Sequence, residues 1–433
     1  MKVERYAVPL VSAAAFLIPG LALWLPSGYS IGAAVLLLGA LVLLPLGDRR
    51  IRPLEGAGWL ALSIVAMAFF WLLDSRSGRT DWGGFDRPTK YMIALPCLLL
   101  VHVYAPRVKP FFWGIAIGAI GSGGIALYQR AVPHLPRAMG YTNAIQFGDL
   151  ALLLGLMCLT LFAVRPPGFA RHWQRAVLLL GALLGGLASV LSETRGGWLA
   201  LVVVLPVLVV LLWCHLPHKQ MLRVLAAAVV GIGLLGLTQP HMIDYRLEKA
   251  RTELQQYEKG DQEVTSVGQR LSHWKLAWQM GWDRPLTGWT QNGYEVEKAR
   301  RVHAGLAHPS VLSFSHAHNE VLDIFAKRGL PGVTALLFFY AVPLWLFWPR
   351  RGLRPCPDPD PDPTALALRV VGVLVPVCCI AFGLTQVFMA HNSGNMCYLF
   401  FTLLVYGCLR GHEARAAAPP ATGAPADACP ARQ

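Results

Sequence analysis

The stretch ETRGGWLALVVVLPVLVVLLWC, residues 193–214, decides the fold of this chain. From Gly197 to Cys214 it carries no charged side chain, and a helix of that length covers about 27 Å, close to the hydrocarbon thickness of a bilayer. A second apolar run, residues 176–191, ends just before it, so only a short turn containing Arg195 separates the two. The pair is therefore predicted to be two membrane-spanning helices joined by a tight turn.

Apolar runs of similar length recur along almost the whole chain. Of its 433 residues, 55% are apolar and 14% are charged, whereas soluble proteins carry about 25% charged residues. The sequence therefore predicts an all-α polytopic membrane protein with about twelve transmembrane helices and one long, partly helical external loop. The helices are expected near residues 6–25, 29–46, 57–73, 91–105, 111–128, 146–164, 176–191, 197–214, 222–238, 330–348, 366–388 and 395–409.

The positions of Lys and Arg predict the orientation of these helices, because cationic loops stay on the cytoplasmic side. Cationic segments recur at 47–56, 105–110, 165–175, 214–223 and 348–355. With a cytoplasmic N-terminus, all of them and the tail from Arg410 fall inside. The net charge of +14 is thus mainly a topology signal, and nucleic acid is not an expected partner.

The chain divides into four expected segments. Residues 1–238 hold the first nine helices, 239–329 form the external loop, 330–410 hold the last three helices, and 411–433 are a disordered cytoplasmic tail. A Pro/Asp linker containing DPDPD is expected inside the cell. None of the nine cysteines falls in an external loop, so no disulfide framework is expected, and no Cys/His spacing fits zinc.

The external loop is expected to be helical in two places. Residues 244–263 carry mixed charges at helical spacing, which favours a solvated helix. Ser266 and Gln269 have capping-box spacing, so a second helix is expected to begin there and to end before the Gly/Pro-rich segment 281–289. Four tryptophans suit the headgroup level of the membrane, namely Trp274, Trp278, Trp282 and Trp289.

Cations on the external side are informative because positive charge is disfavoured there unless an anion needs it. Arg195 lies in the short turn, where two following glycines allow close approach; its alternative role is a snorkelling arginine paired with Glu193. Arg270 lies near a helix N-terminus, where it could clamp a phosphate or form a surface salt bridge. Lys90 and Arg137 are further external cations, typical of topology or surface charges as well as ligands.

The segment from Ser315 to Asp323 is the second unusual feature, because it places two histidines at the edge of a membrane helix. Ser315 is expected to cap a short helix that stops at Gly329 and Pro331 and places His318 in its first turn. The helix dipole there disfavours imidazolium, so the ring is expected to be neutral and able to accept a proton. His316, two residues away, is expected to face the other side of that helix, and a satisfied structural histidine is the alternative.

Three segments together resemble the O-antigen ligase family, which shares a superfamily with O-antigen polymerases and bacterial protein O-oligosaccharyltransferases. They are SETRGGWLA (192–200), GQRLSHWKLAWQM followed by DRPLTGW (268–289), and HAHNEVLDIFAKRGLPGV (316–333). The order of an arginine turn, a long external loop with an arginine, and a His-Asn pair carries the resemblance. The twelve-helix layout extends it over nearly the whole chain.

The resemblance implies a glycosyltransferase of the bacterial inner membrane with its active site facing the periplasm. The donor would be O-antigen linked to undecaprenyl diphosphate, and the acceptor a sugar hydroxyl of lipid A–core. Arg195 and Arg270 would contact the diphosphate, and His318, directly before Asn319, would activate the acceptor. The matching position in the last external loop is less clear, with His391 and Asn392 available; Glu320 and Asp323 are further candidate bases.

The residues also predict how the reaction is assisted. A departing diphosphate gains negative charge, which many glycosyltransferases neutralise with a metal held by an Asp-x-Asp pair. No such pair occurs in the external segments, so arginines are expected to replace the metal, and no cofactor is expected. A base acting on the acceptor favours direct displacement with inversion at the sugar carbon.

Two other function classes remain open at this point. An O-antigen polymerase needs the same donor clamp, that is, the arginines Arg195 and Arg270 that would bind the donor diphosphate. It needs the same general base as well, and differs only in its acceptor. A transporter would concentrate its ionisable residues at mid-membrane, often in repeated halves, whereas here they gather at one face. Catalysis is therefore the favoured interpretation.

Overall fold

The computed structural model describes most of the chain as α-helix. It covers residues 2–47, 55–76, 85–237, 266–349 and 362–417, together with positions 248, 252 and 255. Within these residues it contains no β-strand, which confirms the predicted all-α class. The predicted helix at 244–263 and the DPDPD linker fall almost entirely outside the described residues.

A long helix occupies each of the twelve predicted positions. The twelve are α1 (Lys2–Leu21), α2 (Gly28–Leu46), α3 (Glu55–Arg76), α4 (Asp86–Val103), α5 (Val108–Ala131), α6 (Ala144–Val164), α7 (His172–Leu191), α8 (Arg195–Trp213), α9 (His218–Leu237), α13 (Glu320–Phe347), α14 (Pro363–Gly383) and α15 (Asn392–Ala416). Eight of those in the described chain are long and apolar enough to cross a membrane, namely α2, α3, α5, α6, α7, α8, α13 and α14. The protein is therefore a multi-pass membrane protein, and the count of twelve spans stays a prediction.

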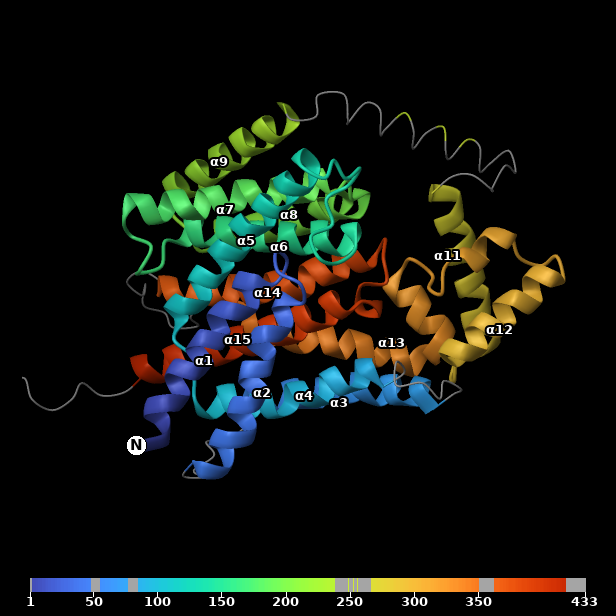
Figure 1. Ribbon diagram of the computed structural model, residues 1–433, viewed down its shortest axis with the longest axis horizontal. Helices are drawn as coiled ribbons and strands as arrows, with labels where there is room; N and C mark the ends of the chain where they lie inside the picture. The colour runs from blue at the N-terminus through green and yellow to red at the C-terminus, as the bar shows by residue number, and fades with distance from the viewer. Residues whose placement is uncertain are drawn as a thin grey trace, which may run out of the picture.

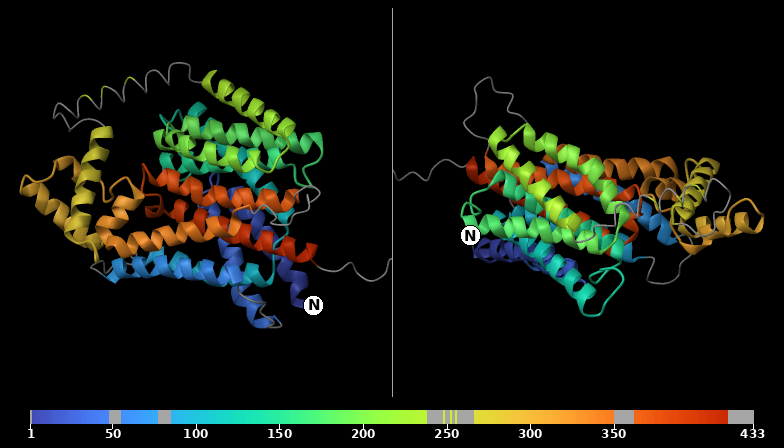
Figure 2. Two further views of the ribbon diagram at one scale, coloured as in Figure 1. Left: turned by 180° about the vertical axis from the view of Figure 1, so that it is seen from behind. Right: turned by 90° about the horizontal axis from the view of Figure 1, so that it is seen from above.

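The long helices form one bundle, in which α1, α2 and α5 run obliquely to most of the others (Figure 1, Figure 2). Two of them, α6 and α14, are buried over most of their length, so they lie at the centre. α14 contacts α6, α8, α13 and α15, and α15 in turn packs on α4. Hairpins such as α6–α7 are close neighbours in space because their connections are short.

A smaller helical unit caps one end of the bundle. It contains α11 (Ser266–Asp283), α12 (Thr290–His303) and the 3₁₀ helix η2 (Pro309–Ser313), and Figure 1 shows it at the end away from the N-terminus. The unit has its own apolar core, built from Leu276, Ala277, Met280, Tyr294, Val311, Ala317 and Ala326. In the part that the structure describes, the loop predicted to be external is therefore a packed platform on α13.

The four loop tryptophans do not share one role, contrary to the predicted membrane belt. Trp278 and Trp282 are about half exposed, and both contact the Phe325 ring, Trp278 at a tilt and Trp282 edge-on. Trp274 and Trp289 are tied inward, because their indole nitrogens donate to the carbonyls of His318 and Met280, respectively. Only the first pair is free to meet lipid headgroups.

The helix before the tenth predicted span begins later than expected. Asn319, not Ser315, is its N-cap: the Asn319 side-chain oxygen accepts from the Leu322 N–H at 3.0 Å, a contact typically worth about 1 kcal/mol. Glu320 and Asp323 then occupy the first turn, where acidic side chains are favoured. The capping signal at Asn319 was present in the sequence but was assigned to the wrong residue.

The predicted break at Gly329 is confirmed. Gly329 has φ 65° and ψ −167° inside α13, so the helix is interrupted there and resumes as the long span. The segment 285–289 docks at this break: Leu330 N–H donates to the Pro285 carbonyl at 2.7 Å, and a Cβ on Gly329 would lie 2.5 Å from the same oxygen. Glycine is required because the backbone turns left-handed where another backbone approaches.

The last helix extends further than predicted. α15 runs to Ala416, so the first residues of the predicted tail are helical, and residues 418–433 lie outside the described part.

Candidate functional site

His318 lies in the loop that enters α13, not in a helix. Its backbone has φ 55°, and its side chain is only 7% exposed. Two bonds tie this loop to the first turns of α13: Ala317 N–H donates to Asp323 Oδ1 at 2.9 Å, and Lys327 Nζ donates to the Ser315 carbonyl at 2.9 Å. The prediction that a short helix presents His318 is therefore wrong, although His318 still sits beside a helix N-terminus.

His316 is a neighbour of His318 rather than a residue on an opposite face. The two ring centroids are 4.4 Å apart at an interplanar angle of 77°. The prediction of opposite directions assumed helical spacing, which this loop does not have. The Phe314 ring also packs edge-on against His318, at 4.5 Å between centroids. The imidazole of His318 is thus held on two sides by other rings.

A chain of hydrogen bonds connects His318 to the core of the bundle. His318 Nδ1 lies 3.0 Å from Gln386 Oε1, and Gln386 Nε2 lies 3.1 Å from His391 Nε2. With an amide oxygen facing it, Nδ1 of His318 is the protonated nitrogen, which leaves the lone pair on Nε2. Asn143, the N-cap of α6, approaches Nδ1 of His391 at 3.3 Å.

The buried imidazoles at this site are neutral near pH 7. The pKa of His318 is lowered to about 4, mainly by burial and also by the positive charge of Arg270, while the Gln386 hydrogen bond acts in the raising direction. Burial also lowers the pKa of His316 to about 3, with a further contribution from His318. Neutral rings follow from these shifts, as the sequence predicted, but desolvation is the main cause.

Arg270 lies on α11 close enough for its charge to act on His318, and its side chain is half-buried. The structure therefore brings together two of the three principal predicted residues. The third, Arg195, is the first residue of α8, and its side chain lies outside the described set.

The start of α8 packs directly against the His318 network. Gly196 leaves no room for a Cβ because Thr385, the neighbour of Gln386, lies against it. A Cβ on Gly197 would lie 2.9 Å from Asp149 Oδ1 on α6. The two glycines thus allow the close approach that the sequence predicted. Glu193, in the same turn, pairs with Arg130 at 3.9 Å, and its predicted pairing with Arg195 stays a prediction.

Lys90 and Arg137, the two further candidate cations, bond to residues in the segments that connect helices at the same end of the bundle. Lys90 pairs with Asp86 and donates to Asn392 Oδ1 at 2.6 Å, next to His391. Arg137 Nε donates to the Ser192 carbonyl at 2.8 Å and so links the α5–α6 connection to the turn before Arg195. Both contacts favour a positioning role.

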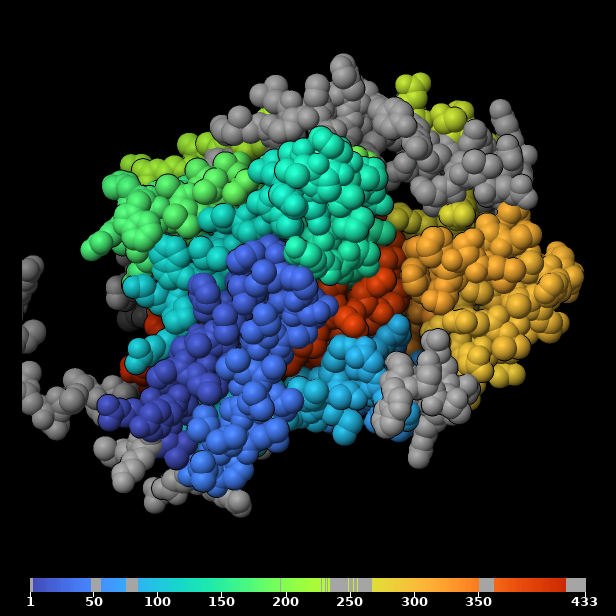
Figure 3. All heavy atoms as spheres, in the orientation of Figure 1, coloured from blue at the N-terminus to red at the C-terminus, as the bar shows by residue number. Residues whose placement is uncertain are grey.

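Asn319 and Glu320, the amide and acidic candidates beside His318, also form hydrogen bonds to backbone atoms of another segment. Asn319 Nδ2 donates to the Leu384 carbonyl at 3.1 Å, in addition to capping α13. Glu320 Oε2 accepts from the Met389 N–H at 2.9 Å. Together these bonds join the start of α13 to the segment between α14 and α15 that carries Gln386 and His391. Figure 3 shows this region in a recess between α4, the α5–α6 connection and the capping unit.

Three residues of the site were missed in the sequence. His273 lies one turn after Arg270 on α11, with its ring 5.6 Å from that of His318 and neither nitrogen hydrogen-bonded. Its i, i+3 spacing from Arg270 was the available signal. Gln386 and Asp149 are polar residues inside predicted spans, and Asp149 is fully buried without a hydrogen bond to either carboxylate oxygen. Polar groups at such positions favour a functional role.

Metal-ligating side chains do not gather at the site within the described chain: no three His, Cys, Asp or Glu residues there are arranged to hold an ion.

Comparison with known families agrees with this geometry. Residues 176–337 match the model of the O-antigen ligase family. Over these residues the match agrees with the predicted resemblance to the O-antigen ligase family. The matched range includes the Arg195 turn, Arg270 on α11 and His318, so the three principal predicted residues fall in the family domain. The family implies lipid-linked glycan substrates in general and includes both ligases and polymerases.

A relative supports the extent of the resemblance. An uncharacterized protein of Haemophilus influenzae is 24% identical over 377 residues, which covers 86% of this chain and 92% of the relative. The similarity therefore extends through the helices on both sides of the family domain.

Proposed function

We propose that this protein is an O-antigen ligase that transfers a polysaccharide from undecaprenyl diphosphate to a sugar hydroxyl of lipid A–core. The observation that carries the proposal is the neutral, buried imidazole of His318 beside the positive charge of Arg270. A base that stays unprotonated and a cation that attracts phosphate are the two groups that this transfer needs at one place.

His318 acts on the acceptor in this proposal. Its Nε2 lone pair takes the proton of the hydroxyl while the acceptor oxygen attacks the anomeric carbon of the donor. The bond from that carbon to the phosphate oxygen breaks, and its electron pair stays on the departing diphosphate. Attack from the face opposite the leaving group inverts the configuration. Gln386 holds Nδ1 of His318, which fixes the ring and keeps the reactive lone pair on Nε2.

Arg270 and Arg195 act on the donor. The charge gained by the diphosphate as it leaves is stabilised by guanidinium groups, whose planar forks bind two phosphate oxygens at once. Arg195 enters this set because its backbone opens α8 against Thr385, beside Gln386. The arginines replace a metal ion, so transfer is expected to proceed fully in excess EDTA.

The proposal is tested by transfer of lipid-linked polysaccharide to purified lipid A–core with the full-length protein in membranes. In a strain that lacks the gene, loss of long-chain lipopolysaccharide with accumulation of lipid-linked polymer is expected. Accumulation of single lipid-linked repeat units would instead assign the chain as a polymerase, the alternative within the same family.

The proposal places the site at the periplasmic face of the inner membrane. The start of α1, the α4–α5 and α6–α7 connections and the end of α15, all predicted to be cytoplasmic, meet at the end of the bundle opposite His318, which supports a common sidedness for them. Alkaline phosphatase fused after Gly260 should be active, and fused after Asp360 inactive. The reverse pattern would contradict the sidedness of the site.

A further inference from the structure

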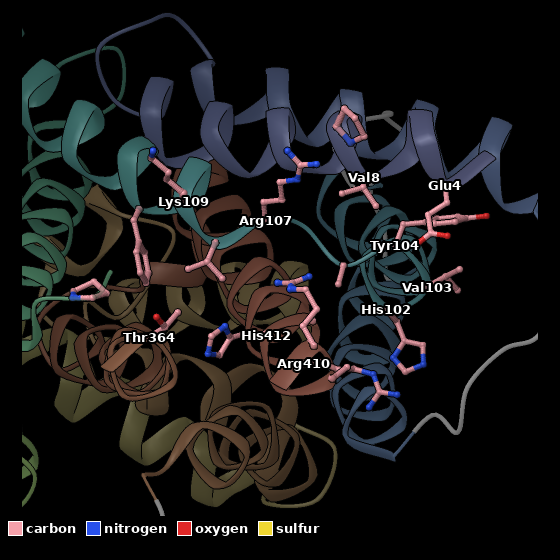
Figure 4. A pocket seen from close by; sticks show the side chains of 18 of the residues that line it. Glu4, Val8, His102, Val103, Tyr104, Arg107, Lys109, Thr364, Arg410 and His412 are labelled. Atoms are coloured by element: carbon pink, nitrogen blue, oxygen red, sulfur yellow. The ribbon is translucent and has the colours of Figure 1, made fainter. Parts of the chain in front are cut away.

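A large hollow lies at the end of the bundle opposite His318. Its volume is about 1160 Å³, and it is formed by the start of α1, the α4–α5 and α6–α7 connections and the end of α15 (Figure 4). Because α4 and α15 each begin beside the His318 network and end here, the length of the bundle separates the two sites. The hollow therefore has no part in the proposed transfer reaction.

The hollow is strongly basic. Five of its lining residues carry a positive charge and one, Glu4, a negative charge; the cations are Arg5, Arg107, Lys109, Arg410 and Arg415. Among the described residues, none of these five forms an ion pair with a carboxylate, whereas the nearby carboxylates Glu413 and Asp362 are taken by Arg369 and His412. Arg107 and Arg410 reach the hollow from different elements (Figure 4).

The walls of the hollow are partly apolar, which distinguishes it from a site for a small soluble anion. Val8, Phe112 and Phe169 line it together with the cations. A smaller hollow adjoins it and shares Lys109, and there Trp173 stacks on Trp113 at 5.6 Å between ring centroids. Trp173 is 54% exposed, and exposed tryptophans of membrane proteins favour the level of the lipid headgroups.

We propose that this hollow binds an anionic phospholipid, with its phosphate headgroup among the five cations and its acyl chains along the apolar wall. Basic pockets between membrane helices bind such headgroups, because cations near an anionic surface attract them. The preference of cations for the cytoplasmic side accounts for positive charge at this end, but not for five cations around one hollow. A free phosphate shares the headgroup chemistry but leaves the apolar wall unused.

The test uses the purified full-length protein in neutral detergent, with binding measured by native mass spectrometry. The probes are phosphatidylglycerol, phosphatidylcholine and inorganic phosphate. The double variant Arg107→Ala/Arg410→Ala removes two cations of the hollow, and Lys109→Glu reverses an exposed one should the double variant fail to fold. The matched control is Lys219→Ala/Arg223→Ala, which removes two exposed cations from α9 that do not line the hollow.

Phosphatidylglycerol should bind the wild type and the control equally, and phosphatidylcholine should bind neither well. The double variant should lose about thirtyfold in affinity for phosphatidylglycerol, or about fivefold for each cation. An equal loss in the control would show diffuse surface attraction and overturn the site. Binding of inorganic phosphate as tight as that of the lipid would overturn the lipid assignment, and equal binding of phosphatidylcholine would overturn the role of charge.

Discussion

The two ends of the bundle contain histidines and arginines in contrasting settings. At the periplasmic end of the proposed topology, the imidazoles of His316 and His318 are buried, and their pKa values are lowered to about 3 and 4. At the other end, Arg107 and Lys109 are exposed around a hollow, and His412 pairs with Asp362. Burial disfavours the charged form of the imidazoles, so each ring keeps a nitrogen lone pair that can accept a proton. The exposed arginine and lysine side chains stay charged and can bind anions. The comparison predicts that equivalent substitutions at the two ends have very different effects on transfer.

The largest effect is expected for His318→Ala. Loss of a general base typically costs about 10²–10⁴-fold in rate, and His318 is the ring held by Gln386 in the orientation that the reaction needs. Transfer to purified acceptor measures the loss. His412→Ala at the opposite end is the matched control and should stay near wild type.

His316→Ala allows the two histidines of the site to be compared with each other. Because its ring contacts that of His318, its removal should lower transfer, but by less than the loss in His318→Ala. A greater loss in His316→Ala would exchange the roles of the two rings. Full activity of both variants would move the base to Glu320 or Asp323, or would mean that none is needed.

The second effect concerns the donor clamp. Arg270→Ala and Arg195→Ala should each lower transfer about a hundredfold, close to 3 kcal/mol of transition-state stabilisation. Arg→Lys should restore activity only in part, because an ammonium cannot hold two oxygens as a planar fork does. Arg410→Ala, which removes a cation at the hollow, is the control and should leave the rate unchanged. Near-wild-type transfer by either alanine variant would remove that arginine from the site.

The sequence was sufficient for the helices but not for the geometry of the site. Apolar runs predict spans because a helix in lipid satisfies its backbone internally and needs only length and apolar side chains. The placement of Arg270 near His318 followed from motif order, since both belong to the segment that folds back on α13. Gly329 was predicted correctly as a break because few other residues tolerate its conformation.

What the sequence could not supply were the contacts between distant segments. Gln386 meets His318 across 68 positions, and Asn143 reaches His391 across 248, so no local pattern connects them. The opposite facing of His316 and His318 was wrong because it assumed a helix from Ser315, whereas Asn319 caps it. Loop conformation also depends on individual side-chain-to-backbone bonds such as that of Ala317 with Asp323, six residues apart, and residue spacing alone does not reveal which of these bonds form.

A smaller effect is expected for Gln386→Leu, which keeps the size of the side chain but removes its hydrogen bonds. The His318 ring would lose its orienting partner while the base and the arginines remain, so a loss of about tenfold in rate is expected, close to the net value of one hydrogen bond. Gln174→Leu is the matched control, because Gln174 is a buried glutamine that caps α7 at the other end. A rate equal to wild type would show that Gln386 does not position the His318 ring.

The smallest expected effect is a shift in the pH below which transfer activity falls. This shift distinguishes residues that act on the His318 imidazole from residues that only support the fold. The His318 pKa of about 4 means that the base stays unprotonated well below neutrality, so transfer should remain constant from about pH 8 to pH 5 and fall only toward pH 4. Arg270→Ala removes a positive charge that lowers this pKa, so its activity should begin to fall at a higher pH. Gln386→Leu removes a hydrogen bond that raises the pKa, so its fall should begin at a lower pH. Rate profiles against pH for the three proteins measure these opposite shifts, with Arg410→Ala expected to follow the wild type. Shifts in the same direction in both site variants would show general loosening of the fold rather than separate contacts of Arg270 and Gln386 with one imidazole.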